Sequence, residues 1–293
     1  MTYCSPLRYP GGKTKAVPLF KEIIAANGMS RCVYVEPFAG GASVALSLLY
    51  SGDAERVIIN DADPSIYAFW YSCLYDNNRF CNLLSQTVIN AEQWKVQKEV
   101  YSTMRNAAMA GKEVDLLALG FATFYLNRTN RSGIIKGGMI GGGKQDGEYL
   151  MDARFNKEAL EQRIRKVAEY SDGIELHCEN AKNFLLNHYQ GWTDNTLVYF
   201  DPPYVKKGKG LYMNYFSEED HKELAVTIAG LGDLKWFMTY DVEPLIRDIY
   251  QMYRIKKMAL SYSACVHTAK AEEYIIFSNG LSIPSHPLIR ELL

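Results

Sequence analysis

Residues 195–204 read NTLVYFDPPY, in which an apolar run ends at Asp201, Pro202, Pro203 and Tyr204. A short apolar run bounded by polar residues and proline predicts a β-strand. In open α/β sheets, ligands bind just beyond the carboxyl ends of the strands. The Asp-Pro-Pro-Tyr tetrapeptide is therefore expected at a ligand site. The competing interpretation is a proline-terminated strand followed by a solvated acid.

The tetrapeptide carries groups that suit chemistry on an aromatic exocyclic amine. The lone pair of such an amine is delocalised into the ring, so a catalyst has to accept hydrogen bonds from its N–H groups and make the nitrogen more nearly tetrahedral. The Asp201 carboxylate and the Pro202 carbonyl supply two acceptors, and the stiffness of proline fixes their directions. Tyr204 offers a ring on which an extruded base can stack.

Further apolar runs alternate with helical stretches at both ends of the chain. This alternation predicts an α/β fold with a Rossmann-like, mostly parallel sheet and helices on both faces. Too few residues join the last two runs for a crossover helix, so they should form an antiparallel hairpin at the sheet edge. The seven predicted strands are residues 33–36, 57–61, 174–178, 197–200, 234–240, 255–261 and 273–278.

The middle of the chain follows a different pattern. Residues 92–109 and 113–126 have helical periodicity, and the glycine-rich stretch KGGMIGGGK at 136–144 predicts a long loop or hairpin. No parallel strand is evident there, and the β/α pattern resumes near residue 156. We therefore expect residues 67–156 to form an inserted, mostly helical domain. Residues 1–66 and 157–293 should together form the domain that holds the sheet.

The first two predicted strands end in features of a nucleoside-binding fold. VYVE at 33–36 runs into PFAGGA, whose glycines allow a tight turn and a close approach of the backbone to a ligand. The second strand ends at Asp61, where an acid can accept hydrogen bonds from a ribose diol. No GxGxxG cradle for a pyrophosphate precedes it. A ligand with a ribose but no pyrophosphate, such as S-adenosylmethionine, fits this combination.

Composition bounds the class of protein. The chain has 293 residues, 48% hydrophobic and 22% charged, and no apolar run reaches the roughly 20 residues that a membrane span needs. The N-terminus lacks a secretory signal pattern, so a cytoplasmic protein without a membrane partner is expected. Six cysteines lie scattered, with no CxxC pair and no clustering with the five histidines, which predicts neither disulfides nor a metal site. We expect a monomer.

Positive charge is concentrated locally in a chain whose net charge is −1. Residues 116–145 contain Arg128, Arg131, Lys136 and Lys144 but no Asp or Glu, and Lys206, Lys207 and Lys209 form a second acid-free cluster. Ordinary solvated surface is the competing interpretation of each patch. Basic patches on a near-neutral body are typical of a protein that binds a polyanion on one face.

Four segments together resemble the adenine-specific DNA methyltransferases of the Dam and DpnII type, the D12 class. They are SPLRYPGGK at 5–13, VEPFAGGASVAL at 35–46, INDAD at 59–63 and DPPY at 201–204. LNRTNRSG at 126–133, followed by RFN at 154–156, is similar to the region where the target-recognition domain of this family meets DNA. The order of the segments, with the insertion before DPPY, also matches, and the resemblance spans nearly the whole chain.

The resemblance implies transfer of a methyl group from S-adenosylmethionine to N6 of a flipped adenine in duplex DNA. It makes residues 67–156 the target-recognition domain, and a separately acting restriction endonuclease the companion. Asp201, Pro202, Pro203 and Tyr204 become the catalytic residues. The implied cofactor-binding residues are Tyr9, Lys13, Phe38, Gly40, Asp61, Asn180 and Asp201. The implied DNA-binding residues are Asn127, Arg128, Asn130, Arg131, Lys136, Lys144, Lys206 and Lys207.

The chain departs from the family pattern in two places. FAGGA stands where FxGxG is common, so Gly41 is expected to replace the later glycine. Tyr9 stands where some members carry tryptophan, and either ring can stack. Outside these motifs, we expect His221 and His267 at the surface, and Ser217 as the cap of a helix whose first turn is acidic.

Other activities fit the sequence less well. Methylation of cytosine C5 needs a cysteine nucleophile, usually in a Pro-Cys pair, and this sequence has no such dipeptide. Methylation of cytosine N4 generally uses serine in place of Asp201. Ribosomal RNA methyltransferases that modify guanine N2 or adenine N6 share the tetrapeptide but tend to lack the central insertion. A non-catalytic nucleic-acid-binding module should have lost the Lys13, Asp61 and Asp201 set, which is intact.

Overall fold

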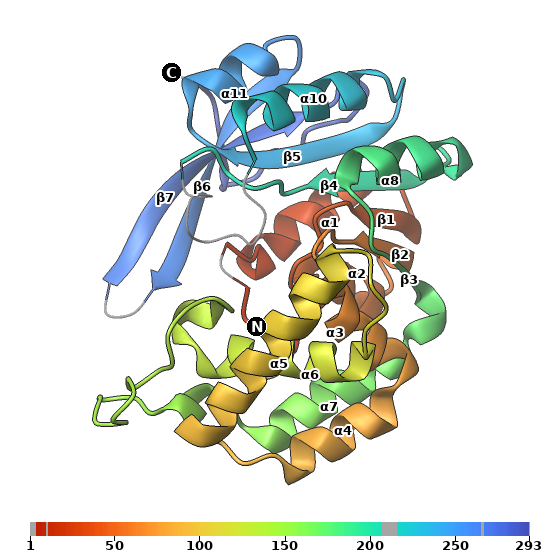
Figure 1. Cartoon of the computed structure of the whole chain (residues 1–293). Helices are drawn as coiled ribbons and strands as arrows, with labels where there is room; N and C mark the ends of the chain where they lie inside the picture. The colour runs from red at the N-terminus through yellow and green to blue at the C-terminus, as the bar shows by residue number, and fades with distance from the viewer. Residues whose placement is uncertain (1–3, 10, 207–215, 265–266, 293) are drawn as a thin grey trace. The chain divides into compact units, whose positions relative to one another are not determined.

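The computed structural model describes residues 4–9, 11–206, 216–264 and 267–292, without the side chains of residues 260–271 (Figure 1). Its contacts divide the chain into two compact units. Residues 13–60 and 173–293 form one, which we call the sheet unit, and residues 2–12 and 61–172 form the other, which we call the helical unit. Within the described part of the chain, no helix is long and apolar enough to span a membrane.

The sheet unit is built on one mixed sheet. Among the described residues it has eight strands in the order β3-β2-β1-β4-β5-β7-β6-β8. Neighbours from β3 to β5 are parallel, and β7, β6 and β8 continue the sheet antiparallel. The strands are β1 (Cys32–Glu36), β2 (Ala54–Asn60), β3 (Ile174–His177), β4 (Thr196–Phe200), β5 (Lys235–Asp241), β6 (Arg254–Ala264), β7 (His267–Phe277) and β8 (Ile289–Arg290).

The predicted α/β sheet with an antiparallel hairpin after its parallel strands is confirmed. The hairpin joins the sheet through β7, which pairs with β5 on one side and with β6 on the other. The eighth strand was not predicted. It has two residues, and it forms only because Ile289 and Arg290 pair with Met258 and Lys257 of β6. So short a strand has no hydrophobic periodicity of its own for the sequence to reveal.

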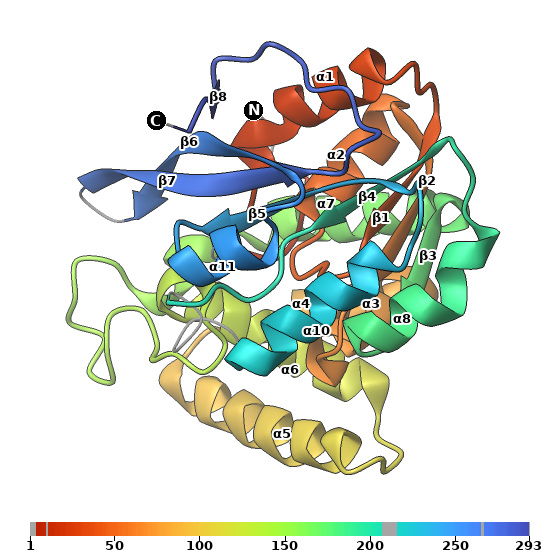
Figure 2. The same ribbon diagram turned by 90° about the horizontal axis from the view of Figure 1, so that it is seen from above.

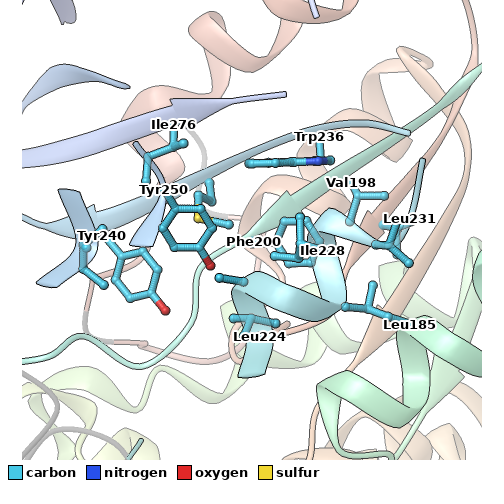
Figure 3. Close-up of a cluster of buried hydrophobic side chains, with 14 of the residues drawn as sticks. Leu185, Val198, Phe200, Leu224, Ile228, Leu231, Trp236, Tyr240, Tyr250 and Ile276 are labelled. Atoms are coloured by element: carbon cyan, nitrogen blue, oxygen red, sulfur yellow. The ribbon is translucent and has the colours of Figure 1, made fainter. Parts of the chain in front are cut away.

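Helices cover both faces of the sheet (Figure 2). The α1 (Val17–Ala26) and α2 (Ser43–Ser51) helices lie on one face, and α8 (Ala181–His188), α10 (Glu218–Ala229) and α11 (Pro244–Ile249) lie on the other. All five residues of β4 are buried, which explains its continuous apolar run. The core beneath α8, α10 and α11 is shown in Figure 3 and includes Leu185, Val198, Phe200, Leu224, Ile228, Trp236 and Ile276.

The carboxyl ends of β1, β2 and β3 are tied together by a buried amide. Asn60, the last residue of β2, donates from Nδ2 to the carbonyls of Pro37 and Glu179, each at 3.0 Å. Its Oδ1 accepts from the Glu179 amide at 2.9 Å. The turn after β1 has left-handed backbone at Gly40 (φ 45°) and Ala42 (φ 42°), a conformation that glycine adopts without steric cost. These bonds fix the edge at which ligands of such sheets bind.

The helical unit contains α3 (Pro64–Tyr75), α4 (Asn77–Gln86), α5 (Ala91–Met109), α6 (Leu116–Thr129) and α7 (Lys157–Glu169). The α6 helix packs against α3 and α5, and α7 packs against α3 and α4. The sequence boundaries, 67 and 156, therefore differ from the boundaries of this unit, 61 and 172. The helical unit extends beyond residue 156 because α7 packs against α3 and α4 and buries Leu160, Ile164 and Val167.

Candidate active site

Three carboxylates mark the ends of three adjacent parallel strands. Glu36 ends β1, Asp201 directly follows β4, and Asp241 ends β5. The strand order reverses between β1 and β4, and such a switch point is where open α/β sheets bind ligands. The DPPY tetrapeptide is therefore placed where its sequence context predicted. Pro202 and Pro203 are buried in this segment.

A buried lysine holds the carboxylate of Asp201. Lys13 is 3% exposed, and its Nζ lies 3.1 Å from both oxygens of Asp201 and 3.1 Å from the Tyr204 hydroxyl oxygen. Glu273 of β7, which is 1% exposed, places its Oε2 3.6 Å from the same Nζ. One ammonium group thus serves two carboxylates and a phenol. Glu273 could not be predicted from the sequence, because nothing in a hairpin strand distinguishes a buried acid from a solvated one.

The electrostatics of this group follow from one positive and two negative charges in a desolvated place. Burial by itself lowers the pKa of Lys13, but the nearby Asp201 and Glu273 carboxylates outweigh burial and raise it. Burial raises the pKa of Asp201, and Glu273 adds to that effect, whereas Lys13 opposes it. A cluster with a net charge of −1 has a favourable interaction with a further positive charge.

Two hydroxyl groups complete the orientation of Asp201. Its Oδ1 accepts from Tyr204 at 3.2 Å and from Thr239 Oγ1 of β5 at 3.0 Å. Thr239 is in turn 2.7 Å from the Tyr199 hydroxyl. A carboxylate has about four acceptor positions, and among the described residues Oδ2 is approached only by Lys13. The side chain of Asp201 is 22% exposed, so Oδ2 can accept a hydrogen bond from a further donor.

Tyr204 is placed differently from the open stacking surface that the sequence suggested. It is 3% exposed, its ring centroid lies 6.1 Å from that of Tyr240, and its hydroxyl is engaged with Lys13 and Asp201. In this conformation the phenol orients the carboxylate. Stacking of a base on the Tyr204 ring stays a prediction, and it requires a rearrangement that exposes the ring.

The chain beyond the tetrapeptide is anchored by Asp241. Its Oδ1 accepts from the Val205 amide at 3.0 Å and its Oδ2 from the Lys206 amide at 2.8 Å. Lys206 itself is exposed, and its Nζ lies 2.8 Å from Glu243. The other members of this predicted basic cluster, Lys207 and Lys209, lie outside the described residues. Asp241 was missed although its signal was present, since it ends an apolar strand just as Asp201 does.

The surroundings of Glu36, at the end of β1, favour the protonated, uncharged form of its carboxyl group. It is 5% exposed, and its Oε1 accepts from the Tyr34 hydroxyl at 3.1 Å and from the Ala45 amide at 3.2 Å. Burial raises the pKa of Glu36 to about 8 despite these two hydrogen bonds, and the charge of Asp201 adds to the rise. At neutral pH this carboxyl therefore carries a proton for most of the time.

The predicted cofactor-binding residues are divided between the two units. Lys13, Phe38, Gly40, Asn180 and Asp201 belong to the sheet unit. Phe38 packs edge-on against Phe216 with centroids 5.9 Å apart. Asn180 is exposed and caps α8, with its Oδ1 accepting from the Lys182 amide at 2.9 Å.

Tyr9 and Asp61 belong to the helical unit. The Tyr9 carbonyl accepts from the Gly12 amide at 3.1 Å. Asp61 directly follows the last residue of β2, and its Oδ1 accepts from the Asp63 amide at 2.9 Å.

The two asparagines of LNRTNRSG hold the loop together from inside the helical unit. Asn127 is fully buried and bonds the Arg8 backbone in both directions, as acceptor at 2.8 Å and donor at 2.8 Å, and also donates to the Gly133 carbonyl at 2.8 Å. Asn130, also buried, accepts from Trp94 Nε1 at 2.7 Å and donates to two carbonyls of the loop. In this conformation both amides support the loop, and their contacts with DNA stay a prediction.

Arg128 of the same segment is largely buried and bonded to the backbone. It is 9% exposed and donates from Nε to the Arg154 carbonyl at 2.7 Å, and from Nη2 to the same oxygen. Burial lowers the pKa of Arg128, and the charges of Arg8, Arg163 and Arg154 add to that effect. In this conformation the guanidinium is engaged with backbone carbonyls, so a contact of Arg128 with DNA stays a prediction that requires a rearrangement. The sequence did not predict this burial, because arginine is almost never fully buried and is therefore expected at the surface.

The remaining predicted DNA-binding residues of this region are exposed. Arg131, Lys136 and Lys144 have solvent-accessible side chains, and they lie on the loop that Asn127 and Asn130 support. The Arg131 amide donates to the Gly138 carbonyl at 3.0 Å, next to a β-bridge between residues 130 and 139. The loop therefore presents its cations on a defined backbone.

Two further expectations outside the motifs can be compared with the structure. Ser217 does cap α10, in a capping box with Asp220. His221 was expected at the surface, but it is 1% exposed and its Nδ1 lies 2.9 Å from the Tyr240 hydroxyl. It is buried because α10 packs this side of the helix onto the sheet. The side chain of His267 is outside the described residues.

The fold is a mixed α/β sheet with a cluster of buried charged residues, Lys13, Asp201 and Glu273, at the end of β4, beside its switch point. The family model of the D12 class N6 adenine-specific DNA methyltransferases matches residues 9–263. The chain therefore belongs to this family, and the sequence prediction of it is confirmed. It is an enzyme that methylates adenine N6 in DNA with S-adenosylmethionine as methyl donor.

Individual similar proteins share at most about a quarter of their residues with this chain in the comparisons that follow. The type II methyltransferase M.MjaIII of Methanocaldococcus jannaschii is 24% identical over 270 residues, which covers 86% of this chain and 89% of the relative. A candidate RNA methyltransferase of Pyrococcus horikoshii is 10% identical, with a TM-score of 0.42 over 93% of this chain and 85% of the other. A SAM-dependent methyltransferase of Agrobacterium tumefaciens is 10% identical, with a TM-score of 0.41 over 91% and 62%.

Proposed function

We propose that Asp201, oriented by Lys13, is the group that activates the target amine. The observation that carries this proposal is the hydrogen-bonding of Asp201: Lys13, Tyr204 and Thr239 fix its carboxylate at the carboxyl end of β4, while Oδ2 keeps acceptor capacity. A preorganised acceptor in a partly desolvated place stabilises developing positive charge without reorganising during the reaction. The substrate is an adenine extruded from duplex DNA at a specific site.

The residues proposed to hold the cofactor fit a cationic nucleoside. S-adenosylmethionine supplies a methyl group on a positively charged sulfonium, and the Lys13–Asp201–Glu273 group has a net charge of −1. Phe38 and Gly40 would line its pocket at the turn after β1, Asp61 would bind the ribose and Asn180 the adenine. Tyr9 and Lys13 are proposed to contact the cofactor as well. For Lys13 this requires that it share its ammonium group with Asp201 and Glu273.

The proposed reaction follows from the acceptors at this edge. Asp201 and the Pro202 carbonyl accept hydrogen bonds from the two N6–H groups, which draws the nitrogen lone pair out of conjugation with the ring. Bound S-adenosylmethionine would supply the methyl group to this nitrogen, with one N–C bond formed and one C–S bond broken. The positively charged amine loses one proton. Asp201 is placed to take it, since burial raises its pKa.

Single-turnover methyl transfer with Asp201→Ala and Asp201→Asn tests this assignment. Loss of a preorganised polar contact costs on the order of 10²–10³ in rate, and loss of the base adds to it, so both variants should be slower by at least that factor. Thr239→Val is the matched control, because it removes one hydrogen bond to Oδ1 and leaves the carboxylate. It should be much less impaired. An Asp201→Asn protein that transfers methyl groups at near the wild-type rate would refute the proposal.

Tyr204 separates orientation from stacking. Tyr204→Phe removes the hydroxyl bonded to Lys13 and Asp201 but keeps the ring, whereas Tyr204→Ala removes both. If the ring stacks on the flipped base, Tyr204→Ala should lose about 1–3 kcal/mol of base capture relative to Tyr204→Phe, measured by fluorescence of 2-aminopurine at the target position. Equal capture by both variants would leave Tyr204 an orienting residue only.

We assign target recognition to the helical unit, through the exposed Arg131, Lys136 and Lys144. The support is their accessibility on a loop braced from inside by Asn127 and Asn130. Arg131→Ala and Lys136→Ala should weaken DNA binding. Loss of a phosphate contact should reduce the slope of the logarithm of the binding constant against the logarithm of the salt concentration by about 1. Loss of a base contact should instead relax the sequence preference. Unchanged affinity and preference in both variants would place the recognition element elsewhere.

The setting of the activity is also part of the proposal. A type II methyltransferase is among the relatives, which supports a companion restriction endonuclease that acts as a separate protein. We propose that the enzyme works as a monomer in the cytoplasm on double-stranded DNA, because a single chain carries all of the proposed catalytic, cofactor and recognition residues. Analytical ultracentrifugation with and without DNA tests the oligomeric state.

A further inference from the structure

A cluster of two imidazoles and two carboxylates lies at the β3 edge of the sheet, apart from the site described above. It is formed by Glu175 and His177 of β3, Glu179 just after that strand, and His188 at the end of α8. His177 Nε2 lies 2.7 Å from Glu175 Oε1. Glu179 Oε1 lies 2.8 Å from His188 Nε2 and 3.6 Å from His177 Nδ1. Thus each histidine faces a carboxylate.

We propose that Glu175, His177 and His188 bind a divalent transition-metal ion of the zinc class. One ligand atom from each of these three residues lies within 4.8 Å of the other two. Zinc binds imidazole nitrogen and carboxylate oxygen at about 2.0–2.2 Å in tetrahedral geometry, which puts ligand atoms roughly 3.4 Å apart. Small side-chain rotations therefore suffice to enclose the ion, and a water molecule completes the four ligands.

The ligand set selects the metal by its chemistry. Imidazole favours zinc and the later first-row ions, whereas magnesium and calcium prefer oxygen ligands throughout. Glu179 has the role of a carboxylate that hydrogen-bonds the second nitrogen of a ligating histidine and fixes its tautomer. A divalent ion also relieves the negative charge of two neighbouring carboxylates. Arg56 offsets this negative charge only in part, since its Nη1 lies 3.6 Å from Oε2 of Glu175.

The imidazoles are held in position by a buried phenyl ring. Phe184 is fully buried, and its centroid lies 5.3 Å from the His177 ring and 5.0 Å from the His188 ring. The two imidazole centroids are 4.3 Å apart. Because β3 and α8 are joined by only a few residues, an ion bound by both would lock the strand to the helix. We therefore expect the metal to raise the stability of the folded protein.

The backbone of Glu179 connects the proposed metal site to Asn60, at the carboxyl end of β2. That backbone makes both hydrogen bonds with Asn60, and the next residue, Asn180, caps α8. The metal proposal does not rest on the catalytic assignment, since it follows from the geometry of the β3 edge alone. Metal binding and methyl transfer can therefore be tested separately.

Isothermal titration of zinc chloride into the tag-free, EDTA-treated full chain tests the site. The wild type should bind about one zinc ion per chain, with a rise in melting temperature. His188→Ala and Glu175→Gln should each weaken binding at least tenfold, and Glu179→Gln by about 10- to 100-fold. Glu175 and Glu179 are partly exposed, so their substitution tests the site even if loss of a histidine impairs folding.

Two control variants separate this site from other ligands. His286→Gln changes a histidine near Glu22, outside the cluster, and Cys178→Ser changes the exposed thiol next to His177. Both should bind zinc like the wild type, and cobalt substituted into the site should show no thiolate charge-transfer absorption. No saturable zinc binding, binding that survives in both His188→Ala and Glu175→Gln, or loss of binding in Cys178→Ser would overturn the proposal.

Discussion

The buried carboxyl of Glu36 should make the stability of the protein fall as the pH rises. Its pKa is about 8 in the folded protein against an ordinary 4.5, mainly because of burial. Between these two values the folded protein keeps a proton that the unfolded chain has lost, so the free energy of unfolding decreases with pH. At about 1.4 kcal/mol per pH unit, this difference amounts to about 5 kcal/mol. The contribution is fully present below pH 4.5 and is lost as the pH passes 8.

Glu36→Gln isolates this effect from every other titrating group. Glutamine keeps an acceptor oxygen for Tyr34 and Ala45 and remains neutral at every pH. The variant should match the wild type near pH 4.5 and exceed its stability by up to about 5 kcal/mol near pH 9.

Urea unfolding at closely spaced pH values measures the difference between the two proteins. Glu22→Gln serves as an exposed control and should show no such trend. A difference between Glu36→Gln and the wild type that stays constant from pH 5 to pH 9 would refute the reasoning.

Four further substitutions test the contributions of buried charge and of backbone conformation to stability. Lys13→Met leaves Asp201 and Glu273 buried without their ammonium group and should cost about 3–5 kcal/mol in urea unfolding, whereas Glu273→Gln relieves excess negative charge and should cost much less; equal losses would contradict this. Gly133→Ala, at φ 75° with an added Cβ 2.2 Å from a backbone oxygen, should lower the unfolding free energy by more than about 1 kcal/mol, and a neutral result would mean that the loop adapts. Arg128→Ala should lower stability by about 1.5–3 kcal/mol and, if the guanidinium stays buried in the complex, leave the salt dependence of DNA binding unchanged, whereas a reduced salt slope would show Arg128 to be a DNA contact.

Local patterns were enough to predict seven of the eight strands that the described part of the sheet unit contains. LVYF at 197–200 predicted a strand, and β4 spans Thr196–Phe200. Ser217, followed by acidic residues, predicted a helix start, and α10 begins at Glu218. Such features depend on neighbours within a few residues, whose periodicity and capping chemistry are written in the sequence itself.

The partners of the polar residues could not be predicted in the same way. Lys13 and Asp201 are separated by 188 residues, and Glu273 joins them from the hairpin only because β7 inserts beside β5. Similarly, the sequence predicted no metal site, because the scattered cysteines do not cluster with the histidines, whereas the turn from β3 into α8 brings His177 and His188 together. The identity of a polar residue does not reveal whether it will be solvated or paired.

The sequence by itself determined the family, the strand–helix alternation and the position of DPPY at a strand end, because motifs and hydrophobic periodicity are local properties of the chain. Only the tertiary structure decided that Asn127 and Arg128 are buried supports, that Tyr204 lies buried with its hydroxyl on Asp201, and that Glu36 is protonated near neutral pH. These outcomes depend on desolvation and on contacts between distant segments. Both are fixed when the sheet and its helices pack, and not before.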